Sequence, residues 1–441
     1  MLKLLNQIDS LVWGPPLLIL LVGTGLYLTL RLRLLQISRL SRAFRLIFVS
    51  GEDHHGDVSS FAALCTALAA TVGTGNIIGV ATAIKVGGPG ALFWMWLAAF
   101  FGMATKYAEG LLAIKYRTKD DNGAVAGGPM HYILLGMGEK WRPLAIFFAI
   151  AGVLVALLGI GTFTQVNSIT ESIQNTTTIS PAITALVLSI LVAIAVFGGL
   201  KSISKVSTAV VPFMAIIYIL GTLTVIFFNI GKIPSTIALI LTSAFSPVAA
   251  IGGFAGASIR MAIQNGVARG VFSNESGLGS APIAAAAAKT NEPVEQGLIS
   301  MTGTFIDTLI ICTLTGLTIL VTGVWNSDLN GVALTQSAFS TVFSHFGPAL
   351  LTIFLVLFAF TTILGWNYYG ERCFEFLFGV RFIWLYRVIF VLMVLLGGFI
   401  ELDMVWIIAD IVNALMALPN LIALLVLSPV VIAETKKYFD K

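Results

Sequence analysis

The chain has 441 residues, of which 57% are hydrophobic and only 10% are charged, whereas an average soluble domain is about 25% charged. Apolar windows of about 20 residues recur along nearly the whole length, which predicts an all-α polytopic membrane protein and excludes a barrel of short alternating strands. The formal net charge of +4 lies mostly in short loops. It gives no indication of nucleic-acid binding.

The first predicted membrane helix covers residues 11–30, and a basic amphipathic stretch follows at 34–50. A signal peptide carries its positive charge before the apolar core, whereas five arginines follow the core here, so we expect this helix to be retained. Ten further spans give about eleven in all; they lie near residues 58–84, 91–114, 143–172, 181–199, 206–229, 262–288, 297–324, 347–371, 382–400 and 404–432.

The basic loop residues predict the orientation, because cytoplasmic loops are enriched in Lys and Arg. With the N-terminus outside, nineteen Lys and Arg residues fall on the side of the C-terminus and three on the opposite side. We therefore expect a cell-membrane protein with a cytoplasmic C-terminus. A further apolar segment, 236–258, would invert all later loops if it crossed the membrane. Its glycines and Pro247 favour a short bent element at the outer surface.

The ten later spans divide into two sets of five, whose corresponding members are roughly 200 residues apart. Because five is odd, the second set enters the membrane with opposite polarity, which predicts an inverted-topology repeat. We expect an extra N-terminal helix and amphipathic stretch over 1–56, a first repeat over 57–231 and a second repeat over 232–441. Chance spacing is the alternative. It is disfavoured because both first helices carry a polar interruption.

These interruptions are Gly73-Thr74-Gly75-Asn76 and Ser273-Asn274-Glu275-Ser276-Gly277. An unpaired backbone N–H or C=O costs several kcal/mol at membrane depth, so a break is expected where it holds a polar ligand. The freed N–H groups attract a carboxylate and the freed C=O groups attract a small cation. An amino acid and a sodium ion would satisfy both. Close helix packing is the alternative explanation for the two glycines, but Asn76 and the matching second break favour a binding site.

Glu275 is an ionisable group within a span, which is by default a functional residue. Two interpretations remain open: it binds the ammonium group of a substrate, or it braces the unwound backbone from behind. Arg269 lies six residues earlier, too far along a regular helix to pair with Glu275 face to face.

Several other polar residues have two possible roles each. Gln165 and Asn167 either line a pocket or make interhelical hydrogen bonds. Thr361 and Thr362 either ligate a cation or bond to their own helix backbone. Trp366 either caps a pocket, limiting its volume, or anchors the helix at the membrane interface.

Two further acids lie within spans. Glu109 follows Lys106 by three residues on one helix face, so we expect a structural ion pair between them. Asp307 is placed at similar depth, and the sequence assigns it no role.

The sequence contains no arrangement typical of an enzyme. A nucleophile with its base, or a metal cluster, is absent from the spans, and His54 and His55 lie in a loop expected to be solvated. The cysteines have no metal-binding or redox spacing and are expected to be reduced packing residues; they are Cys65, Cys312 and Cys373.

Three strings together resemble the alanine or glycine:cation symporter family, also called sodium:alanine symporters. They are ALAATVGTGNIIGVATA (67–83), GGPGALFWMWLAAFFGMATKYAE (87–109) and GVFSNESGLGSAPIAAAAAKTNEPVEQG (270–297). The resemblance extends over essentially the whole chain. It implies the five-plus-five inverted-repeat fold of the bacterial leucine transporter, with broken first helices and one added N-terminal helix.

The resemblance also implies sodium ligands. One site would use two backbone carbonyls and two hydroxyls, those of Ala69, Val72, Thr361 and Thr362. Thr71 and Asn76 match ligands of a second sodium site.

For the substrate, Gly75 matches a position whose N–H meets the carboxylate, and Trp366 replaces a smaller apolar residue, which fits alanine or glycine. Many family members have Ala at the position of Ser276 and a His within the run Ala284–Ala288. The candidate substrate-binding residues are Thr74, Gly75, Asn76, Gln165, Phe272, Ser273, Asn274, Glu275, Ser276, Gly277 and Trp366.

The sequence therefore predicts a sodium-coupled symporter of small neutral amino acids that works by alternating access. The alternative is a proton-coupled transporter with Glu275 as the titrating group. A channel would need a polar stripe through several helices, and none is visible.

Overall fold

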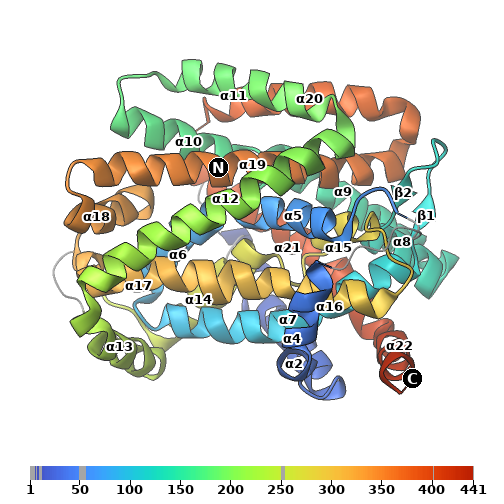
Figure 1. Ribbon diagram of the computed structural model, residues 1–441, viewed down its shortest axis with the longest axis horizontal. Coiled ribbons are helices and arrows are strands. Elements are labelled where there is room, and N and C mark those ends of the chain that lie inside the picture. Colours follow the sequence, from blue (N-terminus) through green and yellow to red (C-terminus); the bar gives the residue numbers. More distant parts are fainter. Residues whose placement is uncertain are drawn as a thin grey trace.

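Long helices run side by side through the computed structural model, and several cross it from one end to the other (Figure 1). The structure describes residues 5, 7–8, 12–48, 56–249, 254–400 and 402–440. The expectation for His54 and His55 lies outside these residues. Within them, the strands are β1 (Thr118–Lys119) and β2 (Val125–Ala126), which pair antiparallel with Thr118 opposite Ala126.

The described part of the chain contains the following helices in order. The N-terminal region has α2 (Pro15–Arg31), α3 (Leu35–Ser38) and α4 (Leu40–Ile47). The next group comprises α5 (Ser60–Thr71), η1 (Gly75–Gly79), α6 (Val80–Gly87), α7 (Ala91–Lys115), α8 (Pro129–Tyr132), η2 (Ile133–Met137), η3 (Glu139–Trp141), α9 (Arg142–Leu158), α10 (Phe163–Thr176), α11 (Pro181–Val196) and α12 (Gly199–Phe228).

The C-terminal half repeats this pattern of long and broken helices. It comprises η4 (Ile230–Lys232), α13 (Ile233–Phe245), α14 (Ile259–Asn274), α15 (Ala281–Ala286), α16 (Pro293–Thr304), η5 (Phe305–Cys312), α17 (Thr313–Thr322), η6 (Val324–Asn326), α18 (Gly331–Phe343), α19 (Phe346–Phe378), η7 (Val380–Phe382), α20 (Ile383–Gly397), α21 (Leu402–Val426) and α22 (Ser428–Phe439).

Local sequence explains where many of these helices begin. Ser59 and Ser258 precede α5 and α14, and their hydroxyls accept hydrogen bonds from Ala62 N and Met261 N, respectively. Such caps satisfy backbone donors that have no partner in the first helical turn. Proline stands in the first turn of α2, α9, α11, α13, α16 and α22, where its missing N–H costs nothing.

Among the described residues, seven helical segments are long and apolar enough to cross a membrane, and the bent pair of α5 with η1–α6 makes eight. The remaining predicted spans correspond to the shorter α2 and α11 and to the α14–α15 pair, which is interrupted. All eleven predicted spans therefore coincide with helices. Some boundaries shift by seven residues: α12 begins at Gly199 rather than near 206, and α19 ends at Phe378 rather than near 371. The spans predicted over 143–172 and 404–432 each divide into two helices, α9 with α10 and α21 with α22.

The segment predicted as a bent outer element is not one continuous helix. It contains most of α13, whose 13 residues extend about 20 Å, and the chain leaves the helix at Ser246. An antiparallel bridge then pairs Val248 with Ala257. In Figure 1, α13 and α18 lie at the left end of the bundle, opposite the β1–β2 hairpin, α8 and the C-terminus.

The burial of the helices separates the centre of the bundle from its lipid-facing surface. Of the most apolar 18-residue stretch of each helix, 83% is buried in α7, whereas 22% is buried in α20. Apolar side chains are exposed along α11, α12 and α20, including Ile194, Phe213 and Trp384. Because lipid solvates such side chains, these helices form the outside, while α7 packs at the centre against α14 and α16.

Candidate binding site at the two helix breaks

The first break releases two backbone carbonyls of α5. The N–H of Gly73 donates to Asn76 Oδ1 at 2.8 Å, and the N–H of Asn76 donates to Gly73 O at 3.2 Å. In a continuous helix these two N–H groups would bond to the carbonyls of Ala69 and Val72. The chain bends by 53° between α5 and η1–α6, so these two carbonyls end the first half-helix without their helical partners.

Two hydroxyls of α19 lie beside these carbonyls. Thr362 Oγ1 donates to Val72 O at 3.3 Å and to Phe358 O at 3.0 Å, and Thr361 Oγ1 donates to Phe358 O at 2.9 Å. A hydroxyl that donates its proton to a backbone carbonyl retains oxygen lone pairs for a cation. The close approach depends on Gly365, because a Cβ there would lie 2.7 Å from Ala70.

The second break interrupts the helix between α14 and α15. Glu275 ends α14 in the left-handed region with φ of 57°, followed by Gly277 at 90° and Gly279 at 82°. A non-glycine residue there costs about 1–2 kcal/mol. Hydrogen bonds to the Glu275 carboxylate offset this cost: Trp366 Nε1 donates at 2.8 Å and Ser280 Oγ at 2.5 Å.

The two breaks face each other and share one carboxylate. A Cβ on Gly75 would lie 3.0 Å from Ser273 Cα, so glycine is needed for this contact. Asp307 accepts hydrogen bonds from Asn76 Nδ2 at 2.7 Å, from Ser273 Oγ at 2.9 Å and from Thr308 Oγ1 at 2.8 Å. Asp307 belongs to the π-helical η5, an irregularity frequently found at functional sites.

Gln165 contacts the first break, whereas Asn167 does not. Gln165 Oε1 accepts from Thr74 N at 3.3 Å, and Asn167 Nδ2 donates to Ile400 O at 3.0 Å. Gln165 therefore contacts the candidate site, whereas Asn167 connects α10 to the segment between α20 and α21. Thr74 Oγ1 is buried and has no hydrogen-bond partner within the described ranges, so it remains available to a ligand.

Large aromatic side chains surround the breaks. Trp366 is completely buried, which excludes the role of an interface anchor. It approaches the break between α9 and α10 closely, because a Cβ on Gly161 would lie 2.9 Å from Trp366 Cβ. Phe272 packs against Trp406 with ring centroids 5.2 Å apart.

An ion pair lies next to the Phe272–Trp406 contact. Arg269 Nη1 and Nη2 donate to the Asp410 carboxylate at 3.0 and 2.6 Å, and the Arg269 guanidinium lies 5.6 Å from the Phe272 ring. Arg269 thus pairs across to α21 and not with Glu275.

Four of the candidate residues point away from the gap between the breaks. Ser276 Oγ lies 2.9 Å from Thr304 Oγ1 and Gly277 N donates to Glu109 Oε1 at 3.2 Å, while Asn274 Nδ2 donates to Thr308 Oγ1 at 3.0 Å. These contacts hold the second break onto neighbouring helices. The hydroxyl of Thr71 bonds to its own helix backbone.

The prediction of an ion pair between Lys106 and Glu109 is wrong. No ion pair within 4.0 Å involves either side chain in the part of the chain that the structure describes. Glu109 instead accepts from Asn420 Nδ2 at 2.7 Å and from Gly277 N. Lys106 lines a cavity of about 20 Å³ with Thr71 and other residues, which is room for about one water molecule.

The buried charges around the breaks are unbalanced. Glu109, Glu275 and Asp307 contribute three carboxyl groups, and Lys106 contributes one ammonium group. An isolated buried charge is costly unless it is paired or neutralised. The region is therefore suited to a cation.

The sequence predicts both breaks, but several of the contacts around them have no sequence signal. Asp307 had no assigned role, although an acid between Thr304 and Thr308 in an apolar span was a usable signal. Each cysteine is free and buried, as expected. Cys312 additionally lies against the site, with its Sγ 3.3 Å from Ser273 Oγ.

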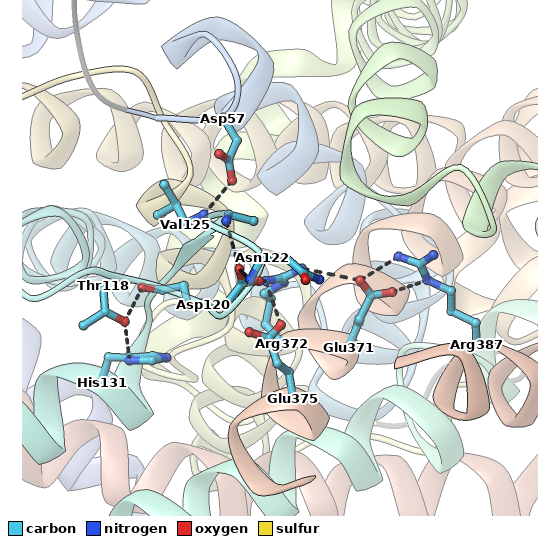
Figure 2. A network of polar contacts seen from close by, with 12 residues as sticks. Asp57, Thr118, Asp120, Asn122, Val125, His131, Glu371, Arg372, Glu375 and Arg387 are labelled. Carbon is cyan, nitrogen blue, oxygen red and sulfur yellow. Dashed lines mark hydrogen bonds and ion pairs between the residues drawn. The ribbon is translucent and has the colours of Figure 1, made fainter. Parts of the chain in front are cut away.

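A charged network closes the opposite end of the bundle from α13 and α18 (Figure 2). Arg372 donates to Asp120 at 3.1 Å and lies 2.7 Å from a Glu375 oxygen. Glu371 accepts two hydrogen bonds from Arg387 at 2.7 and 2.9 Å. This network connects α19, α20 and the loop of the β1–β2 hairpin.

The same hairpin is attached to both broken helices. Asp57 Oδ2 accepts from Val125 N at 2.9 Å, and Asp57 N donates to Ala287 O at 2.9 Å. Arg117, just before β1, donates to the carbonyl of Ala286 at the end of α15 and to that of Ala288 beyond it. The start of α5 and the end of α15 are therefore held together at this end.

His131 gives the network a dependence on pH. Burial, reinforced by the positive charge of Arg372, lowers the pKa of His131 to about 4. The unfolded chain, with a His pKa of about 6.5, binds more protons between these values, so stability present above pH 6.5 is lost as the pH falls toward 4. We expect this single group to cost about 2 kcal/mol between pH 7 and pH 5.

The expected result is a smaller drop of the melting midpoint between pH 7 and pH 5 in His131→Gln than in the unsubstituted protein, both in the same detergent. Because carboxylates also titrate in this range, only the difference between the two proteins reports on His131. Equal drops in both proteins would contradict the assignment.

Comparisons with known proteins agree with this geometry. The sodium:alanine symporter family model matches residues 1–441. The sodium/alanine symporter AgcS of Methanococcus maripaludis is 52% identical over 444 residues, covering 99% of this chain and 97% of that protein. The amino-acid carrier protein AlsT of Bacillus subtilis is 39% identical over 438 residues, covering 99% and 92%.

The fold also has a solved counterpart. The crystal structure of MhsT in complex with L-phenylalanine superposes with a TM-score of 0.61 at 13% identity, covering 86% of this chain and 98% of that chain. This likeness confirms the inverted-repeat membrane fold of the bacterial leucine transporter. The matched proteins are transporters and not enzymes, and the chain belongs to the sodium:alanine symporter family.

Proposed function

We propose that the chain is a sodium-coupled symporter of small neutral amino acids, alanine and glycine, which works by alternating access between its two repeats. The observation that carries this proposal is the pair of facing helix breaks with Asp307 between them. Two freed carbonyls and two hydroxyls lie on one side of the first break, and a carboxylate lies on the other. Oxygen ligands of these kinds suit a hard cation.

The first sodium site is proposed where α5 meets α19. The carbonyls of Ala69 and Val72 lack helical partners, and Thr361 and Thr362 add hydroxyl oxygens. A bound ion would hold the end of α5 against α19, so its release would free the two helices to separate. That coupling of ion binding to helix position is what alternating access requires.

A second sodium site is proposed at Asp307, with Asn76 and Ser273 in contact with it; the hydroxyl of Thr71, which the family resemblance also implies as a ligand, bonds to its own helix. A cation there would offset part of the excess negative charge that Glu109, Glu275 and Asp307 create over Lys106. Asn76 belongs to both the first break and the Asp307 contact. The two proposed sites are therefore mechanically connected through one side chain.

The substrate is proposed to lie between the breaks. The N–H group of Gly75 and the free Thr74 hydroxyl would receive the carboxylate, because the start of a half-helix favours negative charge. Trp366 and Phe272, both buried beside the breaks, are proposed to limit the volume there, which favours a side chain no larger than a methyl group. Binding of substrate and ion would favour each other, since each orders groups that the other contacts.

Glu275 is proposed as a brace and not as the ammonium ligand. Both of its oxygens already accept hydrogen bonds, from Trp366 and Ser280. The second candidate function is proton-coupled transport with Glu275 as the titrating group. The burial of the Glu275 carboxyl group within a span supports this alternative, because buried acids in membrane helices often carry protons. The two functions differ in the ion that drives uptake.

Uptake of labelled alanine into proteoliposomes tests the proposal directly. We expect accumulation with an inward sodium gradient and none with a potassium gradient, together with competition by unlabelled alanine and glycine. Accumulation driven by a pH gradient without sodium would favour proton coupling. Uptake independent of both gradients would refute symport.

Asn76→Ala and Thr361→Ala are each expected to raise the sodium concentration for half-maximal uptake by about tenfold, because each removes a ligand or a group that places one. Sodium titration of alanine uptake measures this. Asn265→Ala and Thr224→Ala are matched controls, since both side chains are only partly buried and bond to their own helices. Unchanged sodium activation in both test variants would refute the two ion sites.

The protein is proposed to lie in the cell membrane with its N-terminus outside and its C-terminus in the cytoplasm, on the basis of the basic residues alone. A single Lys437→Cys variant should then react with an impermeant maleimide only in membranes whose cytoplasmic face is accessible. Reaction in intact cells would refute this orientation.

A further inference from the structure

The turn after α2 adopts an unusual backbone conformation. Arg33 and Leu34 both lie in the left-handed region, with φ of 55° and 56°, which side-chain-bearing residues rarely adopt. Leu34 N donates to Thr29 O at 3.0 Å, and the buried Gln36 side chain donates to Thr29 Oγ1 at 2.9 Å. Such strain persists only where the surroundings enforce it, and it is often linked to function.

Beyond this turn, Arg39 and Arg42 contact the C-terminal helix α22. The guanidinium of Arg39 lies 4.3 Å from the Phe439 ring, and Arg42 lies 4.9 Å from the Tyr438 ring and donates to its hydroxyl at 2.6 Å. Figure 1 shows α2, α4 and α22 along the lower edge of the bundle. These two arginines are therefore committed to packing.

A hollow of about 380 Å³ lies between the turn and α22. Arg31, Arg33 and Lys436 line it with exposed side chains, and no ion pair with them occurs among the residues that the structure describes. Asp440 is the acid in the lining. Three unpaired cations against one carboxylate leave the hollow with a net positive charge.

Apolar side chains are exposed next to these cations. Leu30 is 66% exposed and Ile37 is 62% exposed, and Leu34 projects from the strained turn itself. Leu30 continues the apolar outer face of α2, which includes Ile19. Cations beside exposed apolar side chains at the end of a membrane helix are typical of the headgroup region of a bilayer.

We propose that this hollow binds the phosphodiester headgroup of an anionic phospholipid, with the acyl chains lying along the outer face of α2. Arg31, Arg33 and Lys436 would contact the phosphate oxygens, and Leu30 and Leu34 would contact the upper part of the acyl chains. The lipid would bridge α2 to α22. Inorganic phosphate offers the same charge but no acyl chains, so the apolar contacts favour the lipid.

Native mass spectrometry of the full-length purified protein with added phosphatidylglycerol or phosphatidylcholine tests this site. Retention of phosphatidylglycerol over phosphatidylcholine is expected. Arg31→Gln, Arg33→Gln and Lys436→Gln combined should weaken phosphatidylglycerol binding at least tenfold, since each basic residue near an anionic headgroup contributes on the order of fivefold. The matched control combines Lys201→Gln, Lys205→Gln and Arg381→Gln, which removes the same charge from exposed positions outside the hollow.

Unchanged phosphatidylglycerol binding in the first triple variant would overturn the proposal. An equal loss in the control variant would also overturn it, by showing a general charge effect. Displacement of the lipid by millimolar inorganic phosphate would assign the hollow to free phosphate instead. If the triple variant does not purify, Arg33→Gln and Lys436→Gln alone should each weaken binding about fivefold, and no change in either would be decisive against the site.

Discussion

Asp307→Asn is expected to reduce sodium-driven alanine uptake about 100-fold or more. The carboxylate accepts hydrogen bonds from Asn76, Ser273 and Thr308 at 2.7–2.9 Å. An amide has one acceptor oxygen in place of two and directs an NH₂ group at one of these donors. Losing a charge-assisted acceptor in a buried site costs roughly 3 kcal/mol, which corresponds to about 100-fold. The lost negative charge also weakens attraction for a cation.

The matched control is Asp328→Asn, the same substitution at an exposed loop position, which should transport normally. Thermal stabilisation by sodium relative to choline gives a second readout: present in the unsubstituted protein and the control, and lost in Asp307→Asn. If Asp307→Asn retained sodium activation and sodium stabilisation at ordinary concentrations, Asp307 would not hold the ion.

The breaks themselves were predictable because glycine and amide residues are conspicuous in an apolar run. Gly73 and Gly75 stand where the backbone leaves the helix, and Gly75 stands where it touches Ser273. The family resemblance supplied the four oxygen ligands of the first proposed sodium site, and the structure does bring α5 and α19 together there.

The partners of the buried charges were not predictable from the sequence. Helical spacing placed Glu109 beside Lys106, but Asn420, 311 residues away in sequence, bonds to Glu109 instead. Arg269 similarly pairs with Asp410 on α21. Local periodicity fixes which face of a helix a residue occupies, whereas the packing of distant helices determines which charged group meets it.

Two further helix irregularities, the break between α9 and α10 and the π-helical η5, are only weakly marked in the sequence. The chain breaks between α9 and α10 at Gly159–Thr162, where Gly161 permits the contact with Trp366. The sequence GIGT at 159–162 lies inside the long apolar run from which a single span over 143–172 was predicted. The π-helical η5 around Asp307 has no glycine or proline to mark it. Its one signal was the acid itself.

Glu275→Ala is expected to reduce uptake about 100-fold, whereas Glu275→Gln should stay within about fivefold of the unsubstituted protein. Alanine leaves the Trp366 indole N–H and the Ser280 hydroxyl without their acceptor inside a buried site, at about 1–3 kcal/mol each. Glutamine keeps an oxygen for Trp366, and its NH₂ can donate to Ser280 Oγ, so the brace survives without a charge.

This pair of variants separates the two proposed roles of Glu275. A brace needs hydrogen-bonding groups of the right shape, whereas a titrating group needs a proton that comes and goes. A Glu275→Gln protein as inactive as Glu275→Ala would therefore support proton coupling. Glu139→Ala is the control, because its exposed pair with Arg142 contributes little. Trp366→Phe, which removes the indole N–H donor and part of the ring system, should lose activity to an intermediate degree if the Trp366–Glu275 bond sets the position of the second break.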